Sequence, residues 1–241
     1  MFNIYHKEIS SFLSSFIAYI IIAVFLVAMG LLVWVFPETN VLDYGYADMG
    51  SFFDVAPFVL MFLIPAITMK MLAEEVNSGT IEILFVKPVT KLQIIGGKYF
   101  AALTLVAVAI LPTIVYYFSL SELASPTGNI DAAGIAGSYI GLFLLAAVFS
   151  ALGILTSAFT NNQVVAFVIA AFLSFILFTG LNSLAGINVW SNLSLPLSKL
   201  SLEYHYNAMS KGLLDSRDIL YFLTVIAGLL YFSKMTLAYK K

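Results

Sequence analysis

The sequence predicts an all-α membrane protein that crosses the bilayer six times. Of the 241 residues, 61% are hydrophobic and only 10% are charged, whereas soluble domains usually carry about 25% charged residues. Several apolar runs reach the length of about 20 residues that a helix needs to cross roughly 30 Å of hydrocarbon. These runs lack the strict alternation of barrel strands, and backbone groups in lipid must be satisfied within the segment, so we expect helices.

Apolar residues near the amino terminus recur at three- and four-residue steps. They are Phe2, Tyr5, Ile9, Phe12 and Phe16. This spacing predicts a helix with one apolar face that lies in the membrane interface. The first span, residues 12–36, contains no charged residue. It is longer than the apolar core of a secretory signal peptide, which has about 7–15 residues, so we expect it to be retained.

Five further spans complete the single membrane domain, which we expect to cover residues 1–241. They are predicted over residues 55–73, 99–120, 135–159, 164–184 and 219–239. The stretch 132–198 has no charged residue and is too long for one helix, so its polar residues 160–163 divide the fourth span from the fifth. Pro65 and Pro112 predict kinks in the second and third spans. Small residues near the fourth span favour close helix packing. They are Gly134, Gly137, Gly141 and Gly153.

Lysine and arginine are unequally divided between the two sides of this arrangement. The side with both termini holds eight, which are Lys7, Lys70, Lys87, Lys91, Lys98, Lys234, Lys240 and Lys241. The other side holds three, which are Lys199, Lys211 and Arg217, and most of the acids. Because basic residues accumulate in cytoplasmic loops, both termini and the loop at residues 74–98 are predicted to be cytoplasmic.

Residues 74–98 form a charged loop between two apolar spans and are the best place for a soluble partner. Ser78 and Gly79 interrupt one helix, and Ser78 is expected to cap the next. Ile81, Leu84 and Phe85 fall on one face of this second helix, and the residue before Pro88 avoids helical angles, so the helix is short. The pattern predicts a helix of about two turns at the membrane surface.

Three acids surround this short helix, namely Glu74, Glu75 and Glu82. Apolar anchors with a charged rim suit a groove on a soluble protein. An amphipathic connector resting on lipid is the alternative, although acids at an anionic leaflet disfavour it.

The same loop does not contain an ATP-binding P-loop. That motif needs Gly-x-x-x-x-Gly-Lys-Ser/Thr, in which the hydroxyl binds magnesium. Gly97 and Lys98 match its centre, but Tyr99 replaces the hydroxyl residue and Leu92 replaces the first glycine. We therefore interpret Gly97 and Lys98 as a tight turn and a charge at headgroup depth.

The longest stretch outside the spans, residues 188–217, contains Trp190, Tyr204 and Tyr206. These aromatics are typical of headgroup depth and predict short re-entrant or interfacial helices.

Charged residues of this outer segment suggest local contacts. Asp215, Arg217 and Asp218 predict a local charge network. His205 beside Glu203 is a weak candidate for a metal or proton site.

Other classes of function are disfavoured by composition. The net charge of −2 implies no attraction to nucleic acid. The chain has no cysteine, which excludes thiolate metal sites. No acid or histidine lies deep in a span, which argues against a proton- or ion-coupled carrier.

Two groups of motifs resemble the membrane subunits of ABC-2 type transporters, most closely the gliding-motility-associated ABC transporter permease. The first comprises Pro65-Ala66-Ile67-Thr68-Met69, Glu74-Glu75, Gly79-Thr80-Ile81-Glu82, Pro88-Val89 and Gly97-Lys98. The second comprises Tyr204-His205-Tyr206, Lys211-Gly212, Leu214-Asp215 and Arg217-Asp218-Ile219-Leu220-Tyr221-Phe222. Lys211 stands where the family usually has arginine, so the positive charge is kept.

The resemblance implies that the chain is a permease subunit driven through a coupling helix by a separate ATP-binding cassette ATPase. The coupling residues would be Glu74, Glu75, Gly79, Thr80, Ile81, Glu82, Leu84, Phe85 and Pro88. The outer-segment motif would be His205, Lys211, Gly212, Asp215, Arg217 and Asp218.

The resemblance also implies where the chemistry and the other partners lie. The chain itself would hold no catalytic residue, cofactor or metal, because ATP and magnesium would bind the partner ATPase. A second membrane subunit with a large outer domain, or a second copy of the chain, would complete the assembly. The location would be a bacterial inner membrane, and the role gliding motility or associated secretion. A self-contained channel or secondary carrier is the alternative.

Overall fold

A computed structural model describes residues 1–44, 47–86, 88–186 and 194–239, and these contain helices but no strand. Six helical segments are long and apolar enough to cross a membrane. They are Phe16–Trp34, Gly50–Asn77, Lys91–Leu123, Ala132–Phe159, Gln163–Ala185 and Ser216–Ala238. The predicted all-α class with six spans is confirmed.

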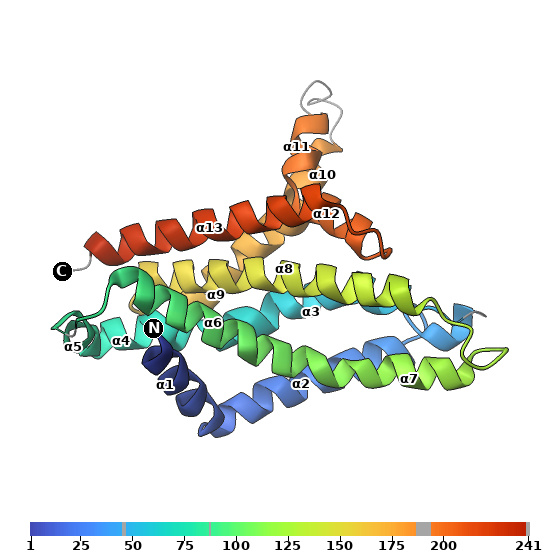
Figure 1. Cartoon of the computed structure of the whole chain (residues 1–241), viewed down its shortest axis with the longest axis horizontal. Coiled ribbons are helices and arrows are strands. Elements are labelled where there is room, and N and C mark those ends of the chain that lie inside the picture. The colour runs from blue at the N-terminus through green and yellow to red at the C-terminus, as the bar shows by residue number, and fades with distance from the viewer. Residues whose placement is uncertain (45–46, 87, 187–193, 240–241) are drawn as a thin grey trace.

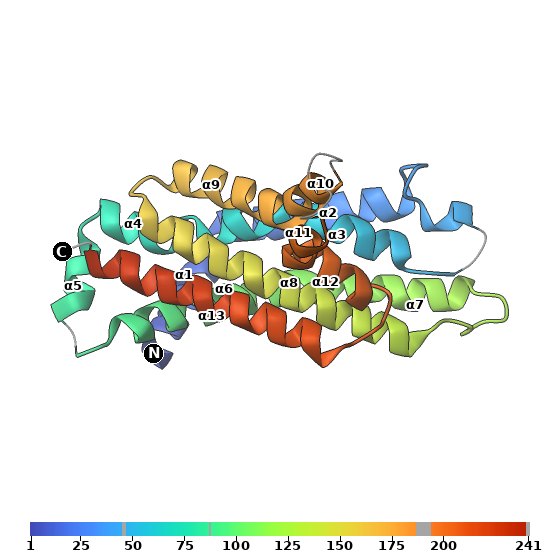
Figure 2. The same ribbon diagram turned by 90° about the horizontal axis from the view of Figure 1, so that it is seen from above.

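The helices form an elongated bundle around α8 (Ala132–Phe159), as Figures 1 and 2 show. This helix packs against α13 (Ser216–Tyr239), α3 (Gly50–Thr68), α9 (Gln163–Phe175) and α6 (Lys91–Ile110). Alanine, glycine and serine dominate its buried positions, and such small residues let neighbouring backbones approach closely. α8 is therefore the central helix of the bundle, and α3, α6, α9 and α13 pack against it.

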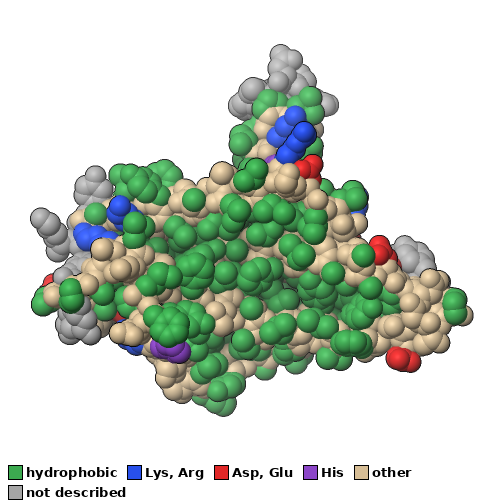
Figure 3. Space-filling model, in the orientation of Figure 1, with side chains coloured by type: hydrophobic (Ala, Val, Ile, Leu, Met, Phe, Trp, Pro, Cys, Tyr) green, Lys and Arg blue, Asp and Glu red, His purple; other side chains and the backbone are tan. Residues whose placement is uncertain are grey.

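The two ends of the bundle differ. The start of α1 (Phe2–Leu13) and the end of α13 lie toward α5 (Thr80–Val86), whereas α7 (Ile114–Leu123) and the loop into α8 lie at the opposite end (Figure 1). The side between the two ends is largely hydrophobic in Figure 3, and acidic side chains appear at the α7 end. This distribution suits a bundle whose long axis crosses the bilayer.

The amino-terminal segment is divided into two helices. α1 (Phe2–Leu13) ends before Ser15, whose extended backbone (φ −91°, ψ 128°) starts α2 (Phe16–Trp34). The first span therefore begins at Phe16 and not at residue 12 as predicted. On the predicted apolar face of α1, Phe12 is buried against the protein, whereas Phe2 is 70% exposed and free to contact lipid. The position of α1 in the membrane interface stays a prediction.

The third span begins eight residues before the predicted residue 99. Thr90 and Gln93 form a reciprocal capping box that starts α6 at Lys91. Lys98 thus lies two turns inside α6. The predicted start at residue 99 took the charge of Lys98 as the edge of the span and is wrong. Further along, Pro112 lies in the 3₁₀ turn Leu111–Thr113 between α6 and α7, at the position where a kink was expected.

The second span is interrupted at Met69, between α3 and α4 (Lys70–Asn77). Pro65 itself lies inside α3. The fifth span continues from α9 through a π-helical turn, Ile176–Gly180, into α10 (Leu181–Ala185). The short 3₁₀ helix Val41–Tyr44 precedes α3.

Two short helices follow in the predicted outer segment, α11 (Ser194–Leu200) and α12 (Leu202–Met209). α10 and α11 project sideways from the bundle, whereas α12 lies on α8 (Figure 1). Trp190 and the rest of residues 188–193 lie outside the described residues.

Candidate functional site

The predicted coupling segment begins where α4 ends. The Ser78 hydroxyl donates to the Glu74 carbonyl (2.8 Å), and Gly79 adopts a left-handed backbone (φ 72°). This is the usual carboxyl-terminal ending of a helix, in which glycine avoids the steric cost of positive φ. Ser78 therefore ends α4, and the prediction that it caps the next helix is wrong.

The short helix α5 turns its described apolar anchors toward the protein. Ile81 and Leu84 are buried, at 6% and 9% exposure. Thr80, Glu82 and Val86 are exposed. The side chain of Phe85 lies outside the described side chains, and Pro88 is exposed after the helix. The expectation that Ile81 and Leu84 face a partner is therefore corrected: these side chains attach α5 to the chain, and the exposed side chains among those described on α5 are Thr80, Glu82 and Val86.

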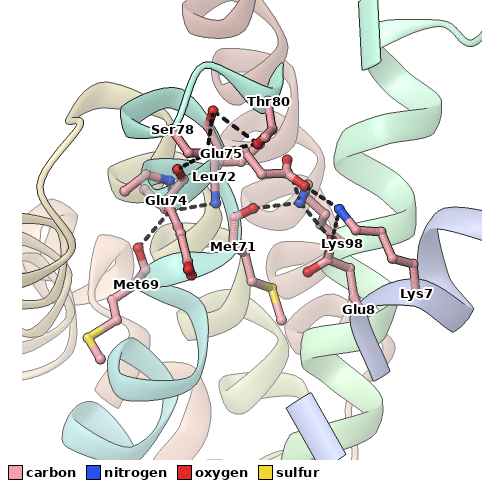
Figure 4. Close-up of polar contacts among 12 residues, drawn as sticks. Lys7, Glu8, Met69, Met71, Leu72, Glu74, Glu75, Ser78, Thr80 and Lys98 are labelled. Atoms are coloured by element: carbon pink, nitrogen blue, oxygen red, sulfur yellow. Dashed lines mark hydrogen bonds and ion pairs between the residues drawn. The ribbon is translucent and has the colours of Figure 1, made fainter. Parts of the chain in front are cut away.

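An ion cluster lies at the base of this segment, formed by Lys7, Glu8, Glu75 and Lys98 (Figure 4). The Lys98 ammonium nitrogen is 2.8 Å from a carboxylate oxygen of Glu8 and 2.8 Å from one of Glu75, and it donates to the Met71 carbonyl. The Lys7 ammonium donates to the other Glu75 oxygen at 2.7 Å. The cluster joins α1, α4 and α6 and contains two positive and two negative charges.

Burial makes this cluster costly to break. The Lys98 side chain is fully buried, and those of Glu8 and Glu75 are 11% exposed. Removing one partner of a buried ion pair typically destabilises a protein by about 3–5 kcal/mol, because the other charge is left uncompensated. Burial acts to lower the pKa of Lys7, but the hydrogen bond and charge of Glu75, with the charge of Glu8, outweigh it and raise that pKa.

Two sequence interpretations change as a result. Glu75 is buried in the cluster, while Glu74 stays exposed. Lys98 is fully buried in the ion cluster, and Gly97 is helical instead of forming a turn. A Cβ atom on Gly97 would lie 3.0 Å from the Met1 carbonyl oxygen and 3.1 Å from Ile4. Gly97 thus lets α1 lie directly on α6.

The interruption at Met69 is filled by a side chain of the central helix. The Ser157 hydroxyl of α8 accepts hydrogen bonds from the backbone N–H groups of Leu72 and Ala73, each at 2.9 Å, and donates to the Met69 carbonyl at 2.9 Å. One hydroxyl has one proton and two lone pairs, so these three hydrogen bonds fill the capacity of the Ser157 hydroxyl. α4 is therefore held by α8 on one side and by the ion cluster on the other.

The outer-segment motif forms a second group of contacts. The His205 ring is 2.7 Å from Asp218 through Nδ1, 2.9 Å from the Lys199 carbonyl through Nε2, and stacked on Tyr221. Both polar partners are acceptors, so the two hydrogen bonds form together only when the ring carries two protons or the aspartate carries one. His205 thereby ties α12 to α13.

The predicted charge network of Asp215, Arg217 and Asp218 is not what the structure shows. Asp215 accepts a hydrogen bond from the Arg217 backbone N–H at 2.9 Å. The carboxylate of Asp218 pairs with His205, as described above. The start of α13 is therefore organised by helix capping and a histidine.

Lys211 and Gly212 lie where the outer segment meets α8. Gly212 has a φ of 79°, and a Cβ there would lie 2.5 Å from the Gly134 Cα. The Tyr206 hydroxyl, fully buried, donates to the Phe53 carbonyl at 2.7 Å. Lys211 is exposed and lines a cavity of about 440 Å³ that also contains Asp54.

Glu8 and Ser157 are the residues that sequence reasoning missed. Glu8 is an acid on an amphipathic helix, and no local pattern marks it as a partner of Lys98. Ser157 carried no local signal, because its partners lie about 85 residues earlier in the chain.

Comparison with known proteins identifies one family. Residues 36–202 match the model of the family described as ABC-2 family transporter protein. No curated protein matches the chain. The matched region includes α3 to α11, and therefore the coupling segment and Lys98, but it does not include α1 or α13.

Proposed function

Because the chain belongs to the ABC-2 family of transporter proteins and is thus a permease subunit of an ABC transporter, we propose that residues 74–98 couple it to a separate ATP-binding cassette ATPase. ATP and magnesium would bind that partner. The observation that carries this proposal is α5: a short helix at one end of the bundle, fixed by Ile81 and Leu84 and presenting Thr80, Glu82 and Val86 outward. A small rigid projection of this kind suits a groove on a soluble partner.

The mechanism follows from how α5 is attached. Movement of α5 by the ATPase is passed to α4, which Ser157 links to the central helix α8. To change a two-state membrane unit from 1:99 to 99:1, the partner must supply roughly 5.5 kcal/mol of differential interaction. A segment held by buried apolar contacts and ion pairs is able to transmit such a difference, whereas a flexible loop would lose it.

A charge reversal on α5 tests the coupling. We expect that the permease purified in mild detergent brings with it a cassette ATPase, recognised by its ATP hydrolysis and its peptides. Glu82→Lys should reduce the amount of ATPase at least tenfold without changing insertion of the permease. Glu122→Lys, the same change on an exposed acid of α7 at the opposite end, is the matched control. Equal ATPase recovery from both variants would contradict the proposal.

We also propose that the membrane is a bacterial inner membrane with both termini and α5 in the cytoplasm. Six spans place the termini on one side, and the excess of lysine at that side favours the cytoplasm. The rest of the assembly would be a second membrane subunit with a large outer domain or a second copy of this chain.

A role in gliding motility or associated secretion is the most specific part of the proposal. It rests on the sequence resemblance alone. Deleting the gene in its host and measuring the spreading of colonies tests this role, because unchanged spreading and secretion would exclude it.

A further inference from the structure

We infer that the ion cluster of Lys7, Glu8, Glu75 and Lys98 makes the amino-terminal helix α1 and the coupling segment α4–α5 one rigid unit, so that α1 moves whenever α5 moves. Glu8, Glu75 and Lys98 are the positioning residues of this unit. The joint movement with nucleotide rests on the proposed function; the rigid connection does not.

The first argument is the place of Lys98. Its ammonium group is fully buried and contacts carboxylates that come from two different helices, Glu8 on α1 and Glu75 on α4. Both distances are 2.8 Å. If α1 and α4 moved apart, Lys98 would lose one carboxylate while remaining buried, and a buried charge without compensation is strongly unfavourable. Independent movement of the two helices is therefore penalised.

The second argument is that the cluster is closed and neutral. Lys7 bridges from α1 to the remaining oxygen of Glu75 at 2.7 Å, so each carboxylate has a cation and the four charges cancel. Figure 4 shows these four side chains pointing toward one another from three helices, with Lys7 and Glu8 both on α1. The Glu75 oxygen nearest Lys98 accepts no hydrogen bond and is compensated by this ion pair alone, so separating the helices would leave it buried without a partner.

The third argument is that contacts around the cluster fix α1 on α6, whereas α4 begins at a helix break about which it can rotate. α1 lies on α6 through Gly97 and through the Tyr5 hydroxyl, 3.1 Å from that of Thr104. On the other side, α4 begins at the break at Met69, where Ser157 takes the place of helical hydrogen bonds. Because Lys98 belongs to α6 and α1 lies on this helix, rotation at this break would carry α5, the cluster, α1 and the start of α6 together.

Spin labels can measure the rigidity directly, because the chain has no cysteine of its own. Labels at Ser10→Cys on α1 and Asn77→Cys at the end of α4 occupy exposed positions on the two helices. In the full-length permease in nanodiscs, we expect one narrow distance between them. The triple variant Glu8→Met, Glu75→Met and Lys98→Met should replace it by a broad distribution. Replacing the buried members of an ion cluster together by apolar residues usually keeps a fold intact. Lys7, which this variant keeps, is 58% exposed, and Lys234→Met on α13 is the control.

An equally narrow distance in the triple Met variant would overturn the inference, since packing alone would then hold α1.

A second pair of labels tests the joint movement in the complex with its ATPase. The pair Ser10→Cys and Val165→Cys on α9 should change its distance when a non-hydrolysable ATP analogue is added, while the Ser10–Asn77 distance stays constant. If Asn77 moves relative to Val165 and Ser10 does not, the inference is wrong even though coupling exists. If no cassette ATPase binds the permease, the proposed function fails, and the rigidity measurement alone decides the inference.

Discussion

At the scale of single residues, Ser157 shows how one hydroxyl stabilises an interrupted helix. A serine in the middle of a helix usually donates only to the carbonyl four residues earlier. Ser157 instead serves three backbone groups of another helix around Met69. Without it, the N–H groups of Leu72 and Ala73 would be buried without these partners.

We therefore predict that Ser157→Ala lowers the free energy of unfolding by about 1–3 kcal/mol, the usual cost of leaving buried polar groups unsatisfied. Thermal unfolding in detergent is the measurement. Ser150→Ala on the same helix is the control, because the Ser150 hydroxyl is equally buried but donates only to the Ala146 carbonyl. Equal unfolding temperatures for the two variants would show that Ser157 does not stabilise the break.

Gly212 is the second residue whose identity the backbone requires. Its φ of 79° is left-handed, and an added Cβ would meet the backbone of Gly134 at 2.5 Å, which no side-chain rotation relieves. We predict that Gly212→Ala destabilises the protein by at least about 2 kcal/mol, from strain and overpacking together.

Gly228→Ala provides the comparison for Gly212. Gly228 lies in α13 with nothing within 4 Å of an added Cβ, and alanine is the better helix former. This variant should unfold at the wild-type temperature or above it. A comparable loss of stability in Gly212→Ala and Gly228→Ala would mean that the outer segment does not depend on the close contact with α8.

At the scale of elements, the spans were the part that the sequence predicted best. Long apolar runs without charges give a strong signal because lipid imposes both length and helical backbone. The polar residues 160–163 correctly divided the fourth helix from the fifth. The short helix after Gly79 was also found from local chemistry.

Errors arose where a distant part of the chain decides the local structure. Lys98 appeared to mark the edge of the membrane because an unpaired lysine cannot be buried. Its partners are Glu8, 90 residues earlier in the chain, and Glu75 on α4. No local sequence pattern predicts that these three residues meet. The predicted orientation of α5 was wrong for a similar reason, because Ile81 and Leu84 pack on the chain itself.

The contact of α1 with α6 leads to a prediction about a whole element. Gly97→Ala should displace α1, because the added Cβ would lie 3.0 Å from the Met1 carbonyl and 3.1 Å from Ile4. Gly96→Ala should be tolerated, because its Cβ would meet only the flexible end of the Met1 side chain at 3.5 Å. Limited proteolysis at Lys7 measures the difference: faster cleavage is expected in the first variant alone. Equal cleavage would mean that α1 does not depend on this contact.

At the scale of the whole molecule, the arrangement places different chemistry at the two ends of one bundle. The end with α5 carries the ion cluster and the break filled by Ser157. The opposite part carries the outer segment, held on α3 by Tyr206, on α8 by Gly212 and on α13 by His205. α8 contacts both groups, so it is the element through which a movement of α5 reaches the outer segment.

This arrangement has a consequence for topology that can be tested without any partner. Asn77, at the end of α4, and Thr127, in the loop between α7 and α8, are both exposed and lie at opposite ends of the bundle. Since the chain has no cysteine, each can be replaced singly by cysteine and treated with a membrane-impermeant maleimide. We predict that Thr127→Cys reacts in intact spheroplasts and that Asn77→Cys reacts only in inverted vesicles or after the membrane is opened. The physical reason is the excess of lysine at the Asn77 end, which retains that end in the cytoplasm during insertion. The reverse pattern would put α5 on the side of the membrane that contains no ATP, and coupling to a cytoplasmic ATPase through this helix would then be impossible.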